Sequence, residues 1–125
     1  MGLAATALCG ASRNSPIHNV RPPDAEMLLE EGGVILLDVR TPKEFAAGHI
    51  PSATSIPITE LSKRLQELPA DKTQPILLYC TVGERSSKAA KILARNGYKD
   101  IYNLTGGINA WTREQKPIEK PTVTP

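Results

Sequence analysis

The amino-acid sequence predicts an α/β fold built on a parallel β-sheet. Short apolar segments alternate with segments of helical spacing between residues 17 and 112. Two of the apolar segments, residues 34–39 and 76–79, carry the nearly continuous large apolar side chains that are typical of buried parallel strands. Strands that alternate with helices form right-handed βαβ units, so we expect the strands to run in the same direction.

The first helices have start signals that can be read directly from the residue types. Pro22 and Pro23 are expected to begin a helix after the first strand. Thr41, Pro42 and Glu44 have the spacing of a capping box, with Thr41 as the N-cap residue. The strands themselves are expected at residues 17–20, 34–39, 54–56, 76–79 and 101–104.

The later helices are predicted from their apolar faces and from the residues that flank them. Thr59 is expected to cap a helix with three leucines on one side. Residues 86–96 have the apolar spacing of a further helix, and Gly97 stands at its natural end. Gly106 and Gly107 are expected to open a final short helix.

The chain of 125 residues has the length of one domain, and a domain of this size buries about two-thirds of the surface of its unfolded chain. We expect a flexible leader at residues 1–16, the folded domain at residues 17–115 and a flexible tail at residues 116–125. The leader resembles the end of a secretory signal without its charged start, and Gly2 fits the loose N-myristoylation pattern. No segment is long enough to span a bilayer. We therefore expect a cytoplasmic protein, with export as the alternative if the leader is a truncated signal.

Charge and composition argue against several classes of partner and cofactor. The net charge is +2, from 15 basic and 13 acidic residues that are dispersed along the chain. Nucleic-acid binding is not expected, since it calls for a basic face, and only 4% of residues are aromatic and could stack on bases. Cys9 and Cys80 form neither a disulfide framework nor metal-ligand spacing, so no metal and no cofactor are expected. A disulfide between these two cysteines would silence the site described next.

The most informative stretch runs from Cys80 to Arg85, between the strand at residues 76–79 and the helix that follows. In such a loop successive backbone N–H groups can point inward at one spot, and the helix N-terminus adds a partial positive charge. A thiol at this place is stabilised as thiolate, its nucleophilic form. The sequence therefore predicts a site for a sulfur nucleophile and an anion. This chemistry requires amides that face the sulfur and a thiol that solvent can reach.

Topology alone brings further loops to the same place. In open parallel sheets the ligand crevice lies beyond the carboxyl ends of the strands. The segment from Asp38 to Arg40, the loop that begins at Cys80, and the segment from Thr105 to Gly107 each follow a predicted strand. We expect these segments to converge on one crevice.

An ordered set of short motifs resembles the rhodanese (sulfurtransferase) homology domain in its single-domain form, over nearly all of residues 17–112. The matching pieces are Leu36-Leu37-Asp38-Val39-Arg40, Glu44-Phe45, Gly48-His49-Ile50-Pro51-Ser52-Ala53, Tyr79-Cys80, Gly83, Arg85-Ser86, Gly97-Tyr98, Leu104, Gly106-Gly107-Ile108 and Ala110-Trp111. The resemblance implies a five-stranded parallel sheet flanked by helices on both faces. It also implies a sulfurtransferase that takes a sulfane sulfur from thiosulfate or another persulfide donor and passes it to cyanide or a thiol.

In this resemblance Cys80 is the sulfur carrier, and the amides of Thr81, Val82, Gly83, Glu84 and Arg85 cradle the persulfide. The expected partners of the protein are small sulfur-containing anions or persulfides, together with a sulfur-acceptor protein. The protein is expected to be a monomer.

The loop and rim residues also have structural interpretations. Gly83 permits a left-handed backbone conformation and close approach to a ligand. Arg85 would either hold a donor's sulfonate as a bidentate fork or pair with a nearby carboxylate. Asp38 and Arg40 are supporting residues whose expected job is a structural ion pair at the crevice rim. Glu84 works against binding a dianion unless it points outward, and it hints at a donor other than thiosulfate.

Two other functions remain as alternatives. A cysteine phosphatase of related fold is disfavoured because four residues lie between Cys80 and Arg85, one fewer than in those enzymes, and no clear general acid is present. A non-catalytic rhodanese-like interaction module is the other alternative, although such modules commonly lack the cysteine.

Overall fold

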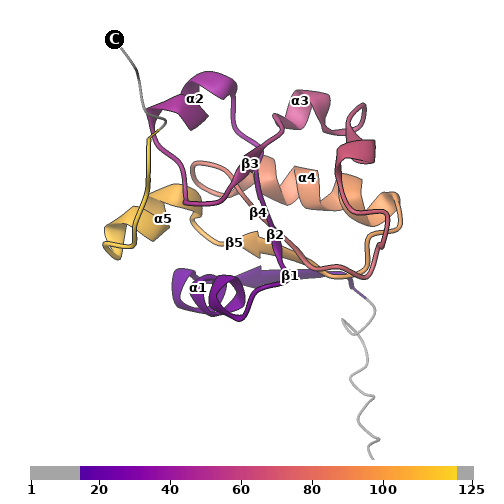
Figure 1. Ribbon diagram of the computed structural model, residues 1–125, viewed down its shortest axis with the longest axis horizontal. Helices are drawn as coiled ribbons and strands as arrows, with labels where there is room; N and C mark the ends of the chain where they lie inside the picture. The colour runs from indigo at the N-terminus through magenta and orange to yellow at the C-terminus, as the bar shows by residue number, and fades with distance from the viewer. Residues whose placement is uncertain (1–14, 121–125) are drawn as a thin grey trace, which may run out of the picture.

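A computed structural model describes residues 15–120, which form a five-stranded parallel sheet with helices on both of its faces (Figure 1). The strands are β1 (Ile17–Val20), β2 (Ile35–Asp38), β3 (Thr54–Ser55), β4 (Ile76–Tyr79) and β5 (Ile101–Leu104). Their order across the sheet is β1-β5-β4-β2-β3, and every neighbouring pair is parallel. The predicted fold class is confirmed.

Different helices cover the two faces of the sheet. The helices α3 (Ile58–Leu61) and α4 (Glu84–Arg95) pack on one face, and α1 (Pro22–Glu31) and α5 (Gly107–Arg113) pack on the other. Successive side chains of β4 point to opposite faces, so Leu78 packs in the core beneath α3 and α4, and Leu77 packs in the core beneath α1 and α5. All four residues of β4 are buried, because this strand lies in the middle of the sheet with helices on both sides.

The predicted capping box at the start of α2 (Pro42–Ala47) is present. The Glu44 backbone N–H donates to Thr41 Oγ1 over 3.2 Å, and the Thr41 N–H donates to Glu44 Oε1 over 3.0 Å. This reciprocal pairing satisfies two of the N–H groups that a helix start leaves free. It also fixes the Glu44 carboxylate at the carboxyl edge of the sheet, where the predicted crevice lies.

The helix predicted after Thr59 is wrong in its start and its length. The N-cap residue is Pro57, and α3 ends at Leu61, to be followed by the separate short 3-10 helix η3 (Leu65–Glu67). The chain is pinned earlier than the sequence suggested, because the Ile58 N–H donates to Val39 O beside the sheet. Thr59 therefore already lies inside the first turn and cannot cap it. The helix α4 also starts earlier than expected, at Glu84.

The two ends of the chain differ in what the structure says of them. The leader expectations for residues 1–14, including those on Gly2 and Cys9, lie outside the described residues, as do residues 121–125. Residues 116–120 differ from the loose tail we expected. Glu119 exchanges two backbone hydrogen bonds of 2.8 Å with His49, and the Trp111 indole donates to Pro117 O over 2.7 Å. The limits of the folded domain otherwise stay a prediction.

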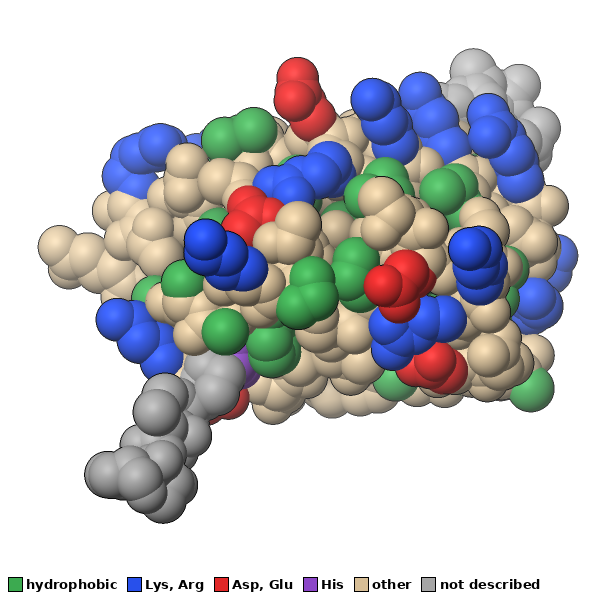
Figure 2. Space-filling view, turned by 90° about the horizontal axis from the view of Figure 1, so that it is seen from above, with side chains coloured by type: hydrophobic (Ala, Val, Ile, Leu, Met, Phe, Trp, Pro, Cys, Tyr) green, Lys and Arg blue, Asp and Glu red, His purple; other side chains and the backbone are tan. Residues whose placement is uncertain are grey.

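The surface carries mixed charge. Figure 2 shows the molecule from above the view of Figure 1. On this face Lys and Arg side chains are spread out, and acidic side chains lie between several of them. Across residues 15–120, no helix is both long and apolar enough to cross a membrane.

Candidate active site

Cys80 lies directly after β4, the central strand, and a three-residue turn separates it from α4. Its side chain is a free thiol. The backbone N–H of Gly83 donates to the sulfur over 3.0 Å, and the Ser86 hydroxyl lies 3.5 Å from it. The loop thus folds back over the sulfur, because Gly83 takes a left-handed conformation with φ +110° at the start of α4.

The start of α5 determines which way the loop's peptide groups face. The Ile108 N–H donates to Cys80 O over 2.9 Å, and the Asn109 N–H donates to Thr81 O over 3.1 Å. These bonds turn the first two carbonyls of the loop away from the sulfur. The approach is so close that a Cβ atom on Gly107 would lie 2.4 Å from Thr81 O, so only glycine fits there. Packing of α5 against the loop therefore leaves N–H groups, rather than carbonyls, around the thiol.

Two opposing effects act on the ionisation of Cys80. Burial raises the pKa of the thiol, because it penalises the charged form. Hydrogen bonds from the N–H groups of Ser86, Gly83 and Arg85 lower the pKa, as does the Ser86 hydroxyl where its hydrogen is turned toward the sulfur, and together they outweigh burial. The net effect is a pKa below that of an ordinary cysteine, which favours the nucleophilic thiolate.

Access to the sulfur is more restricted than the sequence suggested. Cys80 retains only 1% of its exposed surface. Of the five amides predicted to cradle the sulfur, those of Gly83 and Arg85 are directed at it, but solvent hardly reaches the thiol.

Arg85 is paired with Glu44, which is the second of the two interpretations of this arginine. Its guanidinium donates to Glu44 Oε1 over 2.7 Å and to Oε2 over 3.0 Å, and also to Thr81 Oγ1 over 3.0 Å. The hydrogen bond from Arg85 is the largest influence that holds the pKa of the Glu44 carboxyl far below its usual value. Arg85 therefore ties the loop to the capping box of α2. Glu44 has this role in addition to the cap predicted for it.

Asp38 and Arg40 form a buried ion pair at the end of β2. The Arg40 guanidinium donates to both carboxylate oxygens of Asp38, the shorter distance being 2.7 Å, and also to Gly48 O over 2.7 Å. Asp38 is fully buried, and Arg40 is 6% exposed. Both carboxylate oxygens of Asp38 and the Nε and Nη2 groups of Arg40 bond to protein groups, as in a structural ion pair.

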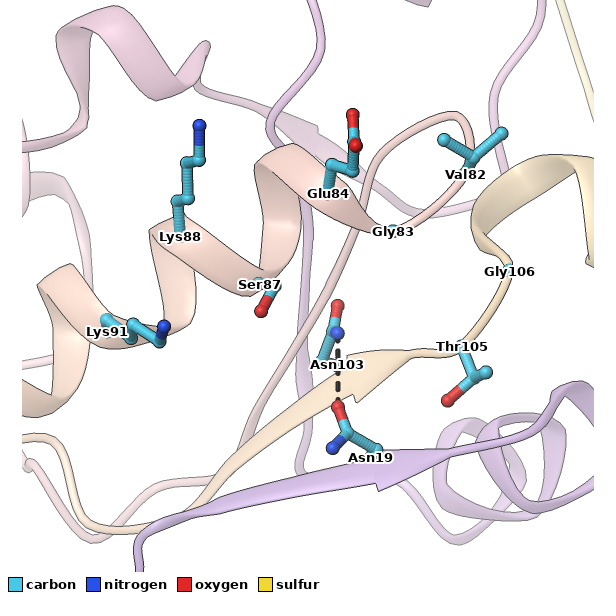
Figure 3. A pocket seen from close by; sticks show the side chains of 10 residues that line it. All are labelled: Asn19, Val82, Gly83, Glu84, Ser87, Lys88, Lys91, Asn103, Thr105 and Gly106. Carbon is cyan, nitrogen blue, oxygen red and sulfur yellow. Dashed lines mark hydrogen bonds between the residues drawn. The ribbon is translucent and has the colours of Figure 1, made fainter.

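The two remaining loop residues point outward. Val82 and Glu84 are both exposed. They border a polar pocket of about 680 Å³ on the β1–β5 side of the loop, whose other lining residues are Asn19, Gly83, Ser87, Lys88, Lys91, Asn103, Thr105 and Gly106. In Figure 3 the Glu84 carboxylate points away from the asparagines on the pocket floor.

Sequence reasoning missed two polar residues behind the sulfur. Ser86 is fully buried on α4, and its hydroxyl donates to Asn103 Oδ1 of β5 over 2.6 Å. Both left a signal in the sequence, since each is a polar residue on an otherwise apolar face. Ser86 shares the buried face of α4 with Ala89 and Ala90, and Asn103 lies inside an apolar strand. A polar side chain at such a place requires a partner.

Comparison with known proteins agrees with this geometry. The family model of the rhodanese-like domain matches residues 21–114, three-quarters of the chain. The chain belongs to the rhodanese-like domain family.

Named relatives of this rhodanese-like chain include sulfurtransferases. A protein named sulfurtransferase from Allochromatium vinosum is 39% identical over 97 residues, which cover 78% of this chain and 89% of the relative. The thiosulfate sulfurtransferase GlpE of Pseudomonas syringae pv. syringae is 33% identical over 90 residues, which cover 72% and 83%. Among solved structures, the rhodanese-like domain of the Anabaena Alr3790 protein superposes with a TM-score of 0.75 at 27% identity and covers 86% of each chain. A sulfurtransferase activity is therefore the general expectation for this rhodanese-like domain.

Proposed function

We propose that this rhodanese-like domain is a sulfurtransferase in which Cys80 carries a sulfane sulfur as a persulfide. The observation that supports the proposal most strongly is the 3.0 Å hydrogen bond from the Gly83 N–H to the cysteine sulfur. A donor at this position stabilises negative charge first on the thiolate and then on the persulfide. The loop is held in this form from outside, by α5 on one side and by the Arg85–Glu44 pair on the other.

The loading step with thiosulfate balances without a redox partner. The Cys80 thiolate attacks the outer sulfur of thiosulfate and forms a new S–S bond. The S–S bond of thiosulfate breaks, and sulfite leaves with the bonding electron pair. In the second step, the nucleophile cyanide or an acceptor thiolate attacks the outer sulfur of the persulfide. The bond to Cys80 then breaks, and the thiolate is regenerated.

The loop must open for both steps, because Cys80 is only 1% exposed. The loop residue Val82 is 54% exposed and buries little surface, so displacing it costs little apolar contact. The amide of Gly83 belongs to the same turn and can follow the sulfur as it moves.

The donor preference follows from the charges at the loop. Arg85 is engaged by Glu44 and is not free to grip a sulfonate. Glu84 adds an exposed carboxylate beside the loop. We propose a persulfide donor, carried on a protein or on a small thiol, in preference to the thiosulfate dianion. Glu84→Lys should then improve the use of thiosulfate, and an unchanged rate would mean that this carboxylate does not act on the donor.

A phosphatase function is less well supported. A phosphoryl group would need an arginine free to bind its oxygens, whereas both terminal nitrogens of Arg85 donate to Glu44 and Thr81. The short spacing from Cys80 to Arg85 also leaves a tight ring, better suited to one sulfur atom. The function of a non-catalytic module is disfavoured by the lowered pKa of the thiol, which an inert domain does not require.

Intact-mass analysis tests the proposal. The protein is incubated with thiosulfate, and separately with a small-molecule persulfide, and we expect the mass of one added sulfur atom. Cys80→Ser, which keeps the size of the side chain, should fold normally by circular dichroism and gain no sulfur. Loading that survives in Cys80→Ser, or the absence of loading from both donors in the folded wild type, would refute the proposal. Hydrolysis of p-nitrophenyl phosphate that depends on Cys80 would favour the phosphatase instead.

A further inference from the structure

A chain of hydrogen-bonding side chains runs from the sulfur of Cys80 to the surface. The Ser86 hydroxyl lies 3.5 Å from the sulfur and donates to Asn103 Oδ1 over 2.6 Å. The Asn103 Nδ2 group in turn donates to Asn19 Oδ1 over 3.1 Å. The outer members, Asn103 and Asn19, line the polar pocket beside the loop, where Figure 3 shows the bond between them.

The fold aligns this chain through the register of the sheet. Asn19 of β1 and Asn103 of β5 are directly paired across two parallel strands, so their side chains leave the same face of the sheet side by side. Asn103 is 6% exposed, whereas Asn19 is exposed. Ser86 reaches Asn103 from above, from the first turn of α4. The three side chains therefore come from three separate elements that already surround the loop.

One proton cannot serve all the acceptors around Ser86. Its hydroxyl has three acceptors within reach: Asn103 Oδ1 at 2.6 Å, Gly83 O at 3.3 Å and the Cys80 sulfur at 3.5 Å. A hydroxyl donates a single hydrogen, and the shortest of these distances directs it to Asn103. In this arrangement the hydroxyl oxygen keeps lone pairs that can accept a hydrogen from a neutral thiol, and it gives no hydrogen to a thiolate.

An asparagine differs from other acceptors because its amide can turn over. After a half-turn, Asn103 presents Nδ2 to the Ser86 oxygen and Oδ1 to Asn19, whose own amide can supply the matching donor. The Ser86 hydrogen is then released toward the sulfur. The hydrogen bonds of Ser86, Asn103 and Asn19 can therefore all be made in two arrangements, with donors and acceptors exchanged. One arrangement is suited to the thiol of Cys80 and the other to the thiolate or persulfide.

We propose that Asn103 is a positioning residue for Cys80, whose side-chain amide decides whether the Ser86 hydroxyl donates away from the sulfur or to it. The inference rests on Cys80 as the reacting thiol and is independent of which donor supplies the sulfur. Asn103 does not touch the reacting atoms, and it acts only through Ser86.

The charged groups near the sulfur belong to other contacts. Arg85 of α4 is paired with Glu44 of α2, and Asp38 is paired with Arg40 at the end of β2. On the pocket side, Glu84, Lys88 and Lys91 of α4 share the lining with Asn103. The through-space effects of exposed charges such as Glu84 and Lys88 are screened by salt, whereas salt changes little in the effect of the buried and half-buried pairs or in the direction of a hydrogen bond. Salt dependence therefore identifies the contribution of the exposed charges.

The test compares two substitutions of nearly equal size. Asn103→Asp introduces a carboxylate, which can only accept, so it retains the Ser86 hydrogen and deprives the thiolate of a donor. Asn103→Leu removes both hydrogen-bonding groups, so the Ser86 hydrogen has no competing side-chain acceptor.

The rate of iodoacetamide alkylation of Cys80 is measured against pH at low and high salt. We expect Asn103→Asp to slow alkylation at neutral pH by roughly tenfold, the factor that one hydrogen bond to a charged group contributes, and to move the midpoint of the profile to higher pH. Asn103→Leu should leave the midpoint where it is or move it to lower pH.

The control is the same pair of substitutions in a Ser86→Ala background. If Asn103 acts through Ser86, the difference between the Asp and Leu variants should shrink and leave only the through-space effect of the buried Asp carboxylate, which salt screens little. A difference of the same size without Ser86, or midpoints that move in the same direction in both variants, would overturn the proposal.

A second pair guards against misfolding of the Asn103 variants. Asn19 is exposed, so Asn19→Asp should fold, and its carboxylate can only accept from Asn103 Nδ2. That would hold Asn103 Oδ1 toward Ser86 and slow alkylation in a salt-independent way, unlike Asn19→Leu. Equal midpoints for these two variants at high salt would also overturn the proposal.

Discussion

Gly107→Ala is the substitution that most directly tests how α5 shapes the sulfur site. Gly107 has φ +61°, and a Cβ atom there would lie 2.4 Å from Thr81 O and 2.5 Å from Cys80 O. Both are backbone atoms, so relief requires the loop and α5 to move apart. The left-handed conformation costs an alanine about 1–2 kcal/mol, and overpacking of this kind adds about 1–3 kcal/mol. We therefore expect the free energy of unfolding to fall by about 2–5 kcal/mol.

Gly33→Ala is a matched control, because Gly33 has a similar φ of +77° and no atom within 4 Å of the added Cβ. It should lose only the conformational part, about 1–2 kcal/mol. Urea unfolding followed by circular dichroism measures both variants. Because Gly107→Ala pushes the loop amides away from the sulfur, it should also shift the pH profile of Cys80 alkylation upward, whereas Gly33→Ala should not. Equal losses of stability together with unchanged alkylation profiles would refute the argument that close packing of α5 orients the loop.

Three further predictions concern the supports of the site and access to it. Because Arg85 lowers the pKa of Glu44, the stability that Glu44 contributes is complete above its ordinary pKa of 4.5 and is lost as the pH falls below that value. The difference in free energy of unfolding between wild type and Glu44→Gln should therefore shrink in urea titrations below this pH. A difference independent of pH would contradict this prediction. Deleting residues 116–125 removes two backbone hydrogen bonds to His49 and the acceptor of the Trp111 indole. The free energy of unfolding in urea should fall by about 2–4 kcal/mol. An unchanged unfolding midpoint would show that this segment does not support the domain. Because Cys80 is only 1% exposed, the ratio of its reaction rate with a bulky maleimide to its rate with iodoacetamide should be far lower than the same ratio for a free peptide thiol. Equal ratios for the two thiols would show that Cys80 is open to solvent.

The fold was largely legible from the sequence because its strands are short apolar segments set between strong helix signals. The central strand, the capping box at Thr41 and the alternation of strands and helices each rest on local chemistry, and the structure confirms them. The helix after Thr59 was mispredicted for the opposite reason. Its start is fixed by a hydrogen bond from Ile58 to Val39, residues that are distant in sequence and adjacent only after folding.

The sequence by itself determined where the Cys80 thiol lies, because a cysteine between a buried strand and a helix start has only one topological position, at the carboxyl edge of the sheet. The partners of that site were decided by tertiary structure. Glu44 meets Arg85 across 41 positions of sequence, and Ser86 meets Asn103 across 17, so neither contact has a local pattern. Burial of the sulfur and the direction of the loop amides likewise depend on the packing of α5, since helices and strands are specified locally but the contacts between them exist only in the assembled core.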